Sequence, residues 1–372
     1  MFRGILLFAV LITACYSTNP FYLPCNNLHK QQQYLEEERK LFAISEKTSP
    51  FNVSSVIPSH DPYFPMSCRN EDGIIIKPVL SHVEHIWNQT HLGSHPKLQR
   101  FTAFDNIISS AINMLWKFTG WKRIRHYNED YMYFHNKDTN DTVFYLHGIS
   151  VLNGLENLYI LNDITKRANV YLLLYHPIFY FDLSPYTHTF CETISNVEAM
   201  MQNVISIDES AKYQIIGNSF GTIQITTLCK RYPSVCMKMT DIILTDPVLM
   251  NFPYSKTSDI VTYGVFFKHP DYYINNYIVN KLRLQKYYDI FHNQIDWYEW
   301  SVDSQFIRLF AKQLVLVIGK YDSMMYVKHS PILDECRVIY TETIHGMVIF
   351  EDFMKYIDTH QTCMMNQWTI HI

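Results

Sequence analysis

The sequence predicts an α/β fold, in which helices cover both faces of a mostly parallel β-sheet. From about residue 131 to residue 358, short apolar runs of strand length alternate with segments of helical pattern. Several runs are apolar throughout, which is typical of strands buried on both faces of a parallel sheet. Between residues 251 and 312 this alternation stops, which indicates an insertion between two strands of the core.

The expected strands are rich in Val, Ile, Leu, Phe and Tyr, which favour a pleated and buried backbone. They cover residues 131–135, 143–147, 170–175, 213–216, 241–245, 314–318 and 336–340, and the last of them is expected to be the final strand. The expected helices cover residues 155–167, 191–206, 222–231 and 345–358. Because strand and helix alternate, neighbouring strands are expected to run parallel, joined by helical crossovers.

The N-terminal residues have the pattern of a targeting segment. Residues 1–3 carry one positive charge, residues 4–14 are small or apolar without a break, and the chain turns polar from Cys15. Eleven such residues are too few to span a bilayer easily, but they fit the core of a signal peptide. Residues 1–17 are therefore expected to be a signal peptide, or a signal anchor if cleavage does not occur.

Two further observations bear on the compartment. N-glycosylation sequons begin at Asn52, Asn88 and Asn140, and eight cysteines agree with an oxidising compartment. They predict a glycoprotein of the secretory pathway that is secreted, lumenal in the endoplasmic reticulum, or anchored in a membrane by its N-terminal segment. A short motif that ends in Cys15 leaves open a bacterial lipoprotein, lipidated at that cysteine.

Composition and spacing exclude several kinds of partner. The net charge of the 372-residue chain is −4, and no basic stripe or zinc-finger spacing occurs, so no nucleic-acid partner is expected. Histidines gather between residues 82 and 95, but their spacing fits no familiar metal site and predicts a surface helix and loop. We therefore expect no metal and no cofactor. Cys229 and Cys236 are near enough to close a small disulfide loop, although buried free thiols explain them equally well.

The motif Gly217-Asn218-Ser219-Phe220-Gly221 lies between an expected strand and an expected helix. A serine on such a sharp turn is forced out of the sheet with its hydroxyl exposed, and the two glycines let strand and helix approach closely. Glycine is scarce in this chain, with 11 in 372 residues, so a pair that flanks one serine indicates a specific backbone requirement. Ser219 is therefore predicted to be the nucleophile of a nucleophile elbow.

With this motif, the chain resembles the α/β-hydrolase superfamily over residues 121–358. The resemblance implies a catalytic triad in the order Ser219, Asp322 and His345, in which the acid follows a late strand and the histidine follows the final one. The serine hydroxyl needs an adjacent base, and the protonated imidazole needs a counter-charge that also fixes its orientation.

The acid and the base each have competitors in the sequence. Asp246 also ends a strand and is the alternative acid, although an aspartate before proline more often caps a turn. His329 and His360 compete with His345, but only His345 combines a glycine neighbour with a place between the final strand and the final helix.

The resemblance also implies an oxyanion hole. Its donors would be the backbone N–H of Phe220 and one backbone N–H from Gly148 or Ile149. His147 is expected to position this loop rather than to transfer protons. Asn218 stands where relatives often carry histidine, which affects the positioning of the elbow but not its chemistry.

The expected organisation has five parts. Residues 1–17 are the targeting segment, residues 18–120 a helical N-terminal extension, residues 121–250 the first part of the core, residues 251–312 a helical cap, and residues 313–372 the second part of the core. The cap is dense in Tyr, Phe and Trp and would lie over the carboxyl ends of the strands, where ligands enter open α/β sheets. An aromatic cap at that place favours an apolar substrate.

The function implied by this resemblance is a serine hydrolase that cleaves an apolar, lipid-like carboxylic ester through an acyl-enzyme on Ser219. Its partner would be a small apolar ester or lipid, with association with a membrane as a further expectation. The alternatives are an acyltransferase with the same triad, a non-catalytic binding protein of the same fold, and a cysteine protease that uses Cys191 or Cys229. More narrowly, Phe220 and residues 246–248 resemble a poorly characterised eukaryotic group, fungal among others, with an N-terminal signal or membrane segment.

Overall fold

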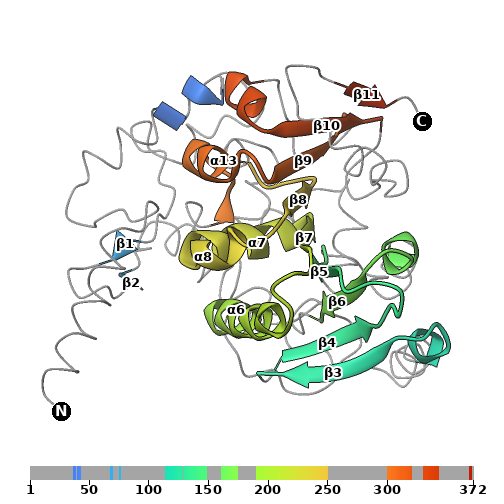
Figure 1. Ribbon diagram of the computed structural model, residues 1–372. Helices are drawn as coiled ribbons and strands as arrows, with labels where there is room; N and C mark the ends of the chain where they lie inside the picture. Colours follow the sequence, from blue (N-terminus) through green and yellow to red (C-terminus); the bar gives the residue numbers. More distant parts are fainter. Residues whose placement is uncertain are drawn as a thin grey trace, which may run out of the picture.

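The computed structural model describes residues 37–38, 40–42, 68–69, 75–76, 114–127, 129–148, 161–174, 190–249, 300–320, 330–342 and 368–370. Their main feature is a nine-stranded sheet in the order β11-β10-β9-β8-β7-β5-β6-β4-β3 (Figure 1). Its strands are β3 (Lys122–His126), β4 (Glu129–Phe134), β5 (Thr142–Leu146), β6 (Asn169–Leu173), β7 (Tyr213–Asn218), β8 (Asp241–Thr245), β9 (Leu314–Gly319), β10 (Arg337–Thr341) and β11 (Trp368–Ile370). Apart from this sheet, β1 (Cys68–Arg69) and β2 (Ile75–Ile76) form a short antiparallel pair.

The large sheet is mostly parallel. Neighbouring strands from β11 to β6 all run in one direction, whereas β4 is antiparallel to both β3 and β6. Every residue of β5 and of β9 is buried. This burial on both faces explains why these strands are apolar, apart from Thr142, instead of alternating apolar and polar residues.

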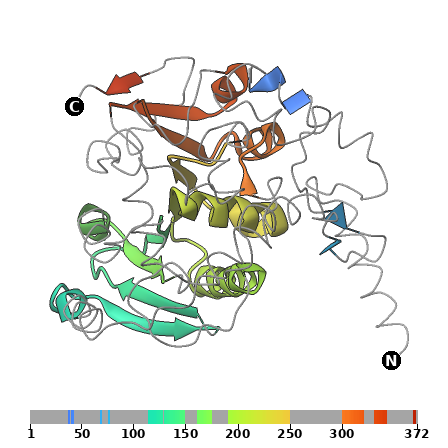
Figure 2. The ribbon, with the colours of Figure 1, turned by 180° about the vertical axis from the view of Figure 1, so that it is seen from behind.

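Helices cover both faces of the sheet (Figures 1 and 2). One face carries α6 (Phe190–Ile207), α7 (Phe220–Arg231), α8 (Pro233–Cys236), α13 (Ser304–Phe310) and the 3₁₀ helix η5 (Pro331–Glu335). Helical residues 114–118 and 161–165 pack through Trp116, Leu161 and Ile164 against the other face. The predicted fold class is thus confirmed, and with the serine turn at the end of the central strand β7 it is the α/β-hydrolase fold.

The expected elements agree closely with the observed ones, except at the two edges of the sheet. The edge strand β3 was not expected, because its residues KRIRH are mostly charged and exposed and have no apolar run. The expectation that residues 336–340 form the final strand is wrong, because β11 pairs in parallel with β10 beyond them. The expected helix over residues 345–358 lies outside the described residues, and of the helix expected over residues 155–167 the described part is helical at 161–165.

The inserted segment begins and ends at neighbouring positions. Leu249 and Val302 form an isolated parallel bridge, and the Val302 N–H donates to the Val248 carbonyl at 2.8 Å. Residues 250–299, most of the expected cap, lie outside the described residues. The helix α13, which the expected cap includes, packs into the core cluster on its face of the sheet. The two stems of the insertion therefore meet just beyond the carboxyl end of β8.

A short piece of the N-terminal extension also belongs to this core. Residues 37–42 lie beside α13 and η5, far from them in sequence (Figures 1 and 2, blue). Phe42 is only 3% exposed and is part of the same apolar cluster as α13. The extension is thus fastened to the main domain at this place.

Candidate active site

A strained backbone places Ser219 directly after the carboxyl end of β7. Its φ of 50° and ψ of −111° lie in a region that residues other than glycine rarely adopt, at a cost of about 1–3 kcal/mol. The Ser219 N–H donates to the Thr245 carbonyl at 2.9 Å, and the Ser219 carbonyl accepts the Thr222 N–H at 2.9 Å. The serine is half-buried, and its hydroxyl does not cap α7. The predicted strand-turn-helix is therefore present, with the helix starting directly after the serine.

The two glycines of the elbow stand where no side chain fits. A Cβ on Gly221 would lie 1.9 Å from the Leu146 carbonyl oxygen, and a Cβ on Gly217 would lie 2.8 Å from the Gly221 carbonyl. The start of α7 is thus pressed against the ends of β5 and β7, as the sequence predicts. We call residues 217–221 the elbow.

Asn218 fastens the elbow to the next strand. Its side chain is buried, and the Thr245 hydroxyl lies 3.0 Å from Asn218 Oδ1 and 3.1 Å from the Gly217 carbonyl. These contacts join the carboxyl ends of β7 and β8 beside Ser219. Asn218 therefore has a structural function in the elbow.

The expected oxyanion loop lies against the elbow. A Cβ on Gly148 would be 3.1 Å from Ser219 Cβ and 3.0 Å from the Asn218 carbonyl oxygen, so the glycine backbone approaches the serine closely. Phe220 is the first residue of α7, and N–H groups in the first turn of a helix have no partner within the helix. The third expected donor, Ile149, lies outside the described residues.

His147 is a buried, uncharged support for this loop. Burial lowers the pKa of His147 to about 4, against the opposing effect of its hydrogen bond to the Gly148 carbonyl. Because that carbonyl can only accept, Nδ1 carries the proton and donates at 2.7 Å. A neutral imidazole that holds the backbone of the next residue agrees with the positioning function expected for His147.

Asp246, the alternative acid, joins two strand ends. It is fully buried with φ at 49°, and its backbone N–H donates to the Val317 carbonyl at 2.8 Å. Its carboxylate accepts the backbone N–H of Gly319, the last residue of β9, at 3.1 Å. The Asp246 carboxylate thus binds the backbone at the end of β9, from which the chain continues towards Asp322.

Asp322 and His345 lie outside the described residues, as do His329 and His360. Asp322 is the third residue after the end of β9, and His345 the fourth after the end of β10. Both strands are parallel to β7, so the chain leaves them at the carboxyl edge of the sheet, where the strands end and where Ser219 lies. Close to that edge, the Lys320 N–H donates to the Thr341 carbonyl at 2.7 Å, which ties the two strand ends together.

A row of polar side chains on α7 holds both stems of the insertion. Thr222 Oγ1 accepts the Val248 N–H at 3.2 Å, and Thr226 Oγ1 donates to the Trp300 carbonyl at 2.7 Å. One turn further, Lys230 Nζ donates to the Ser301 carbonyl at 2.9 Å. The helix that begins at the candidate nucleophile therefore also carries the base of the inserted segment.

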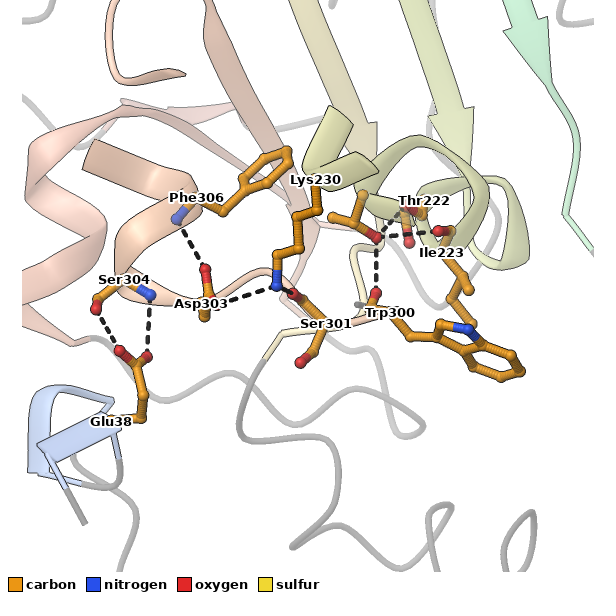
Figure 3. Close-up of polar contacts among 10 residues, drawn as sticks. Glu38, Thr222, Ile223, Lys230, Trp300, Ser301, Asp303, Ser304 and Phe306 are labelled. Carbon is orange, nitrogen blue, oxygen red and sulfur yellow. Dashed lines mark hydrogen bonds and ion pairs between the residues drawn. The ribbon is translucent and has the colours of Figure 1, made fainter. Parts of the chain in front are cut away.

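Lys230 is part of a buried ionic cluster (Figure 3). Its ammonium lies 3.0 Å from the Asp303 carboxylate, and both side chains are completely buried. Asp303 also caps α13 by accepting the Phe306 N–H at 2.7 Å. Next to it, the Glu38 carboxylate accepts hydrogen bonds from the N–H of Ser304, at 2.9 Å, and from the Ser304 hydroxyl. We call Glu38, Lys230, Asp303 and Ser304 the buried anchor.

Reasoning from the sequence missed this anchor. Its local signal is the spacing of Thr222, Thr226 and Lys230, which places three polar residues on one face of α7. Glu38 gives no signal, because it is one of several charged residues in a helix-prone stretch that reads as exposed.

The structure shows whether four of the cysteines are paired, and so tests part of what was expected of them. A disulfide joins Cys229 and Cys236, so α7 and α8 are covalently linked, and Cys229 is not available as a nucleophile. Cys191 is half-buried, Cys336 is buried, and neither takes part in a disulfide. Cys191 is the second residue of α6 and is not on a turn that follows a strand.

Within the described part of the chain, no helix is long and apolar enough to cross a bilayer. In the same residues, no group of three or more His, Cys, Asp or Glu side chains is placed to hold a metal ion. The N-terminal run, the histidines of residues 82–95 and the sequons at Asn52 and Asn88 lie outside those residues. Asn140 is described and exposed, and its side-chain amide donates to Asp208 at 3.0 Å.

No family profile and no curated protein matches the chain by sequence. In structure it is similar to a candidate lipase from Acinetobacter baumannii AYE, at a TM-score of 0.47 and 12% identity over 71% of this chain and 100% of that one. It is also similar to a membrane phospholipase A, a bacterial virulence factor. The TM-score is 0.44 and the sequence identity 14%, over 70% of this chain and 93% of that one. A third similar structure is a naproxen esterase from Bacillus subtilis, with a TM-score of 0.41 and a sequence identity of 11% over 70% of this chain and 98% of that one. These values describe a likeness of fold, and no site residue is carried over from them.

Proposed function

We propose that the chain is a serine hydrolase that cleaves an apolar carboxylic ester through an acyl-enzyme on Ser219. The supporting observation is the elbow, in which a half-buried serine is held in a strained backbone between a buried strand and a buried helix. Strain of this kind persists only where the surrounding structure over-determines it, and it concentrates at functional sites. The closely packed glycines and the contacts of Thr245 supply that surrounding structure here.

In the proposed reaction, His345 takes the proton of Ser219 while Oγ forms a bond to the carbonyl carbon of the ester. Asp322 orients the imidazole and balances its positive charge. The tetrahedral intermediate then breaks its C–O bond to the leaving alcohol, which receives the proton from His345. A water molecule, deprotonated by the same histidine, attacks the acyl-enzyme and releases the acid and free Ser219.

The negative oxygen of the intermediate needs donors that are already in place. The first is the backbone N–H of Phe220, at the start of α7, and the second is an N–H of Gly148 or Ile149. The close approach of Gly148 to the elbow supports this assignment. Loss of one such donor typically lowers kcat by about 10²–10³.

The experiment for the nucleophile is labelling with a fluorophosphonate probe. We expect the wild-type protein to be labelled and to hydrolyse a medium-chain ester, and Ser219→Ala to lose both while its melting temperature is unchanged within about 2 °C. Ser206→Ala is the matched control, because Ser206 is exposed on α6 and its hydroxyl donates to the Asn203 carbonyl of the same helix. Full activity in Ser219→Ala, or no labelling of the wild type at any concentration, would refute the proposed function.

The finer part of the proposal is a lipid-like substrate that meets an aromatic cap. Each buried methylene contributes about 0.8 kcal/mol, so kcat/KM should rise by up to about 15-fold for every two carbons until the pocket is filled. A panel of p-nitrophenyl esters from acetyl to decanoyl measures this dependence. A flat profile, or a preference for acetyl esters, would contradict the apolar substrate while leaving the Ser219 result standing.

A further inference from the structure

The hydroxyl of Thr222, the third residue of α7, joins the backbone of the candidate nucleophile to the base of the insertion. It donates to the Ser219 carbonyl at 2.6 Å and accepts the Val248 N–H at 3.2 Å. A threonine in a helix often bonds back to a carbonyl three or four residues earlier, so the first contact alone is ordinary. The second contact comes from a segment 26 residues further along the chain. The buried hydroxyl therefore links two separate parts of the fold.

Residues 245–248 hold Ser219 from both sides of its α-carbon. The Ser219 N–H donates directly to the Thr245 carbonyl at 2.9 Å. The Ser219 carbonyl is held from the same segment through the Thr222 hydroxyl, and it also accepts the Thr222 N–H at 2.9 Å. The contact of the N–H restricts φ of Ser219, and the contacts of the carbonyl restrict ψ. These are the two dihedrals, at 50° and −111°, that are strained.

The same carbonyl sets the direction of a proposed oxyanion donor. A peptide group is planar, so in a trans peptide the Phe220 N–H points opposite to the Ser219 carbonyl. Within the described part of the chain no peptide bond is cis. A hydroxyl that holds the Ser219 carbonyl therefore also aims the Phe220 N–H. Through one peptide plane, Thr222 contacts the group that orients both the serine and the first donor.

The hydrogen bonds continue from Thr222 into both stems of the insertion. The Val248 carbonyl accepts the Val302 N–H at 2.8 Å. An unbroken series of bonds thus runs from the Ser219 carbonyl through the Thr222 hydroxyl to the second stem. Thr222, Val248 and Val302 are each at most 5% exposed. Hydrogen bonds that are shielded from water in this way are stronger than the same bonds at the surface.

We propose that Thr222 is a positioning residue, whose hydroxyl fixes Ser219 and the Phe220 N–H relative to the base of the insertion. This inference rests on the proposed function and adds to it a residue that acts only through the backbone of the elbow. The oxyanion develops only in the transition state, so a misaimed donor slows the chemical step and leaves the binding of the ester largely unchanged. Loss of the hydroxyl should therefore lower kcat without raising KM.

Thr222→Val keeps the shape of the side chain and removes both of its hydrogen bonds. For a medium-chain p-nitrophenyl ester we expect kcat to fall about tenfold, which is less than the loss of about 10²–10³ that follows removal of a whole donor. KM should change by less than about twofold, and labelling by a fluorophosphonate should slow by the same factor as kcat. Thr222→Ser retains the hydroxyl, so its kcat should stay within about twofold of the wild type.

Thr226→Val is the matched control, because Thr226 is also buried on α7 and undergoes the same change of shape. Its hydroxyl lies within 3.1 Å of the carbonyls of Thr222, Ile223 and Trp300, and so contacts the second stem instead of Ser219. We expect both valine variants to lower the melting temperature, but only Thr222→Val to lower kcat by more than about twofold. If Thr222→Val does not fold, Thr222→Ser and Thr222→Ala repeat the comparison, because they differ only in the hydroxyl.

The outcomes separate this inference from the proposed function. A labelled, active wild type whose kcat is unchanged in Thr222→Val, or is lowered equally in Thr226→Val, would overturn the assignment to Thr222 and leave Ser219 as the nucleophile. A loss of kcat in Thr222→Ser as large as in Thr222→Val or Thr222→Ala would also overturn it, because the hydroxyl would then be irrelevant. An unlabelled and inactive wild type would refute the proposed function and the positioning together.

Discussion

The elbow and the buried anchor sit at the two ends of α7 and are built in different ways. The elbow is five consecutive residues whose geometry is set by backbone: two glycines that admit no Cβ and a serine in a strained conformation. The anchor is a set of charged and polar side chains, and Glu38 and Ser304 in it are 266 residues apart in sequence. The elbow depends on the absence of a side chain at two glycines. The anchor depends on side chains that are far apart in sequence and meet only in the folded chain.

This difference determines how each region should respond to mutation. In the elbow, an added methyl group meets the backbone of β5, which cannot move without disturbing the centre of the sheet. In the anchor, removal of one charge takes a paired ion away from a buried charge of opposite sign. Substitutions in the elbow should destabilise the fold for steric reasons, and substitutions in the anchor for electrostatic reasons. Suitable second variants can distinguish these two causes.

The largest effect is expected from Gly221→Ala. Its Cβ would lie 1.9 Å from the Leu146 carbonyl oxygen and 2.6 Å from the carbonyl carbon, so we expect a loss of about 4 kcal/mol or more in the free energy of unfolding. Denaturant unfolding measures it. Gly120→Ala is the control: Gly120 has φ at 89°, but its nearest neighbour is the Phe134 ring at 3.4 Å, so only about 1–2 kcal/mol of backbone strain is expected. Equal losses at both sites would contradict the steric account.

A comparably large effect is expected from Lys230→Met. The substitution leaves Asp303 buried without its counter-ion, which typically costs about 3–5 kcal/mol. Arg308→Met removes the exposed pair with Glu335 and should cost less than about 1 kcal/mol.

The double variant Lys230→Met/Asp303→Asn identifies the cause. Asn can still cap α13, so removing the stranded charge should restore more than half of the lost stability. If the double variant is less stable than Lys230→Met, the loss arises from packing and the electrostatic account of the anchor is wrong.

The same contrast explains what could be predicted from the sequence. The elbow and the central strands were predictable, because a glycine requirement, an apolar run and a helix start each depend on neighbours in sequence. The edge strands were not: β3 has a charged, exposed sequence, and β11 is only three residues long. Edge strands bury little, so their sequences carry little of the apolar pattern.

The anchor could not be predicted for a different reason. The sequence does not distinguish a buried lysine from an exposed one. Lys230 lies in the last turn of α7, where a basic residue is also usual on an exposed helix. Its burial depends on residues 300–303, which return to α7 only after the inserted segment. Similarly, the choice between Asp246 and Asp322 depends on where a loop lies and not on a pattern of residues.

A smaller effect of opposite sign is expected at Gln224, also on α7. Its side chain is fully buried, and within the described structure neither its amide nitrogen nor its amide oxygen has a hydrogen-bond partner. Gln224→Met keeps the shape and removes the buried unpaired groups, so the free energy of unfolding should rise by about 1–2 kcal/mol. Gln214→Met is the matched control: its amide donates to Asp241 at 2.9 Å, and its loss should destabilise by about 1 kcal/mol. A loss at Gln224 similar to that at Gln214 would mean that its amide is satisfied by water.

The smallest effect concerns the strain in the elbow. Ser219→Gly and Ser219→Ala both lack the hydroxyl, but only glycine adopts a φ of 50° and a ψ of −111° without strain. Relief of about 1–3 kcal/mol, less the roughly 0.5–1 kcal/mol that glycine costs through the unfolded chain, should leave Ser219→Gly more stable than Ser219→Ala by about 1 kcal/mol. At Gln202, an exposed position within α6, the same pair should show the opposite order, because glycine in an ordinary helix is less stable than alanine by about 1 kcal/mol. If glycine is also the less stable residue at position 219, the backbone there is not strained, and the principal support for Ser219 as a positioned nucleophile is removed.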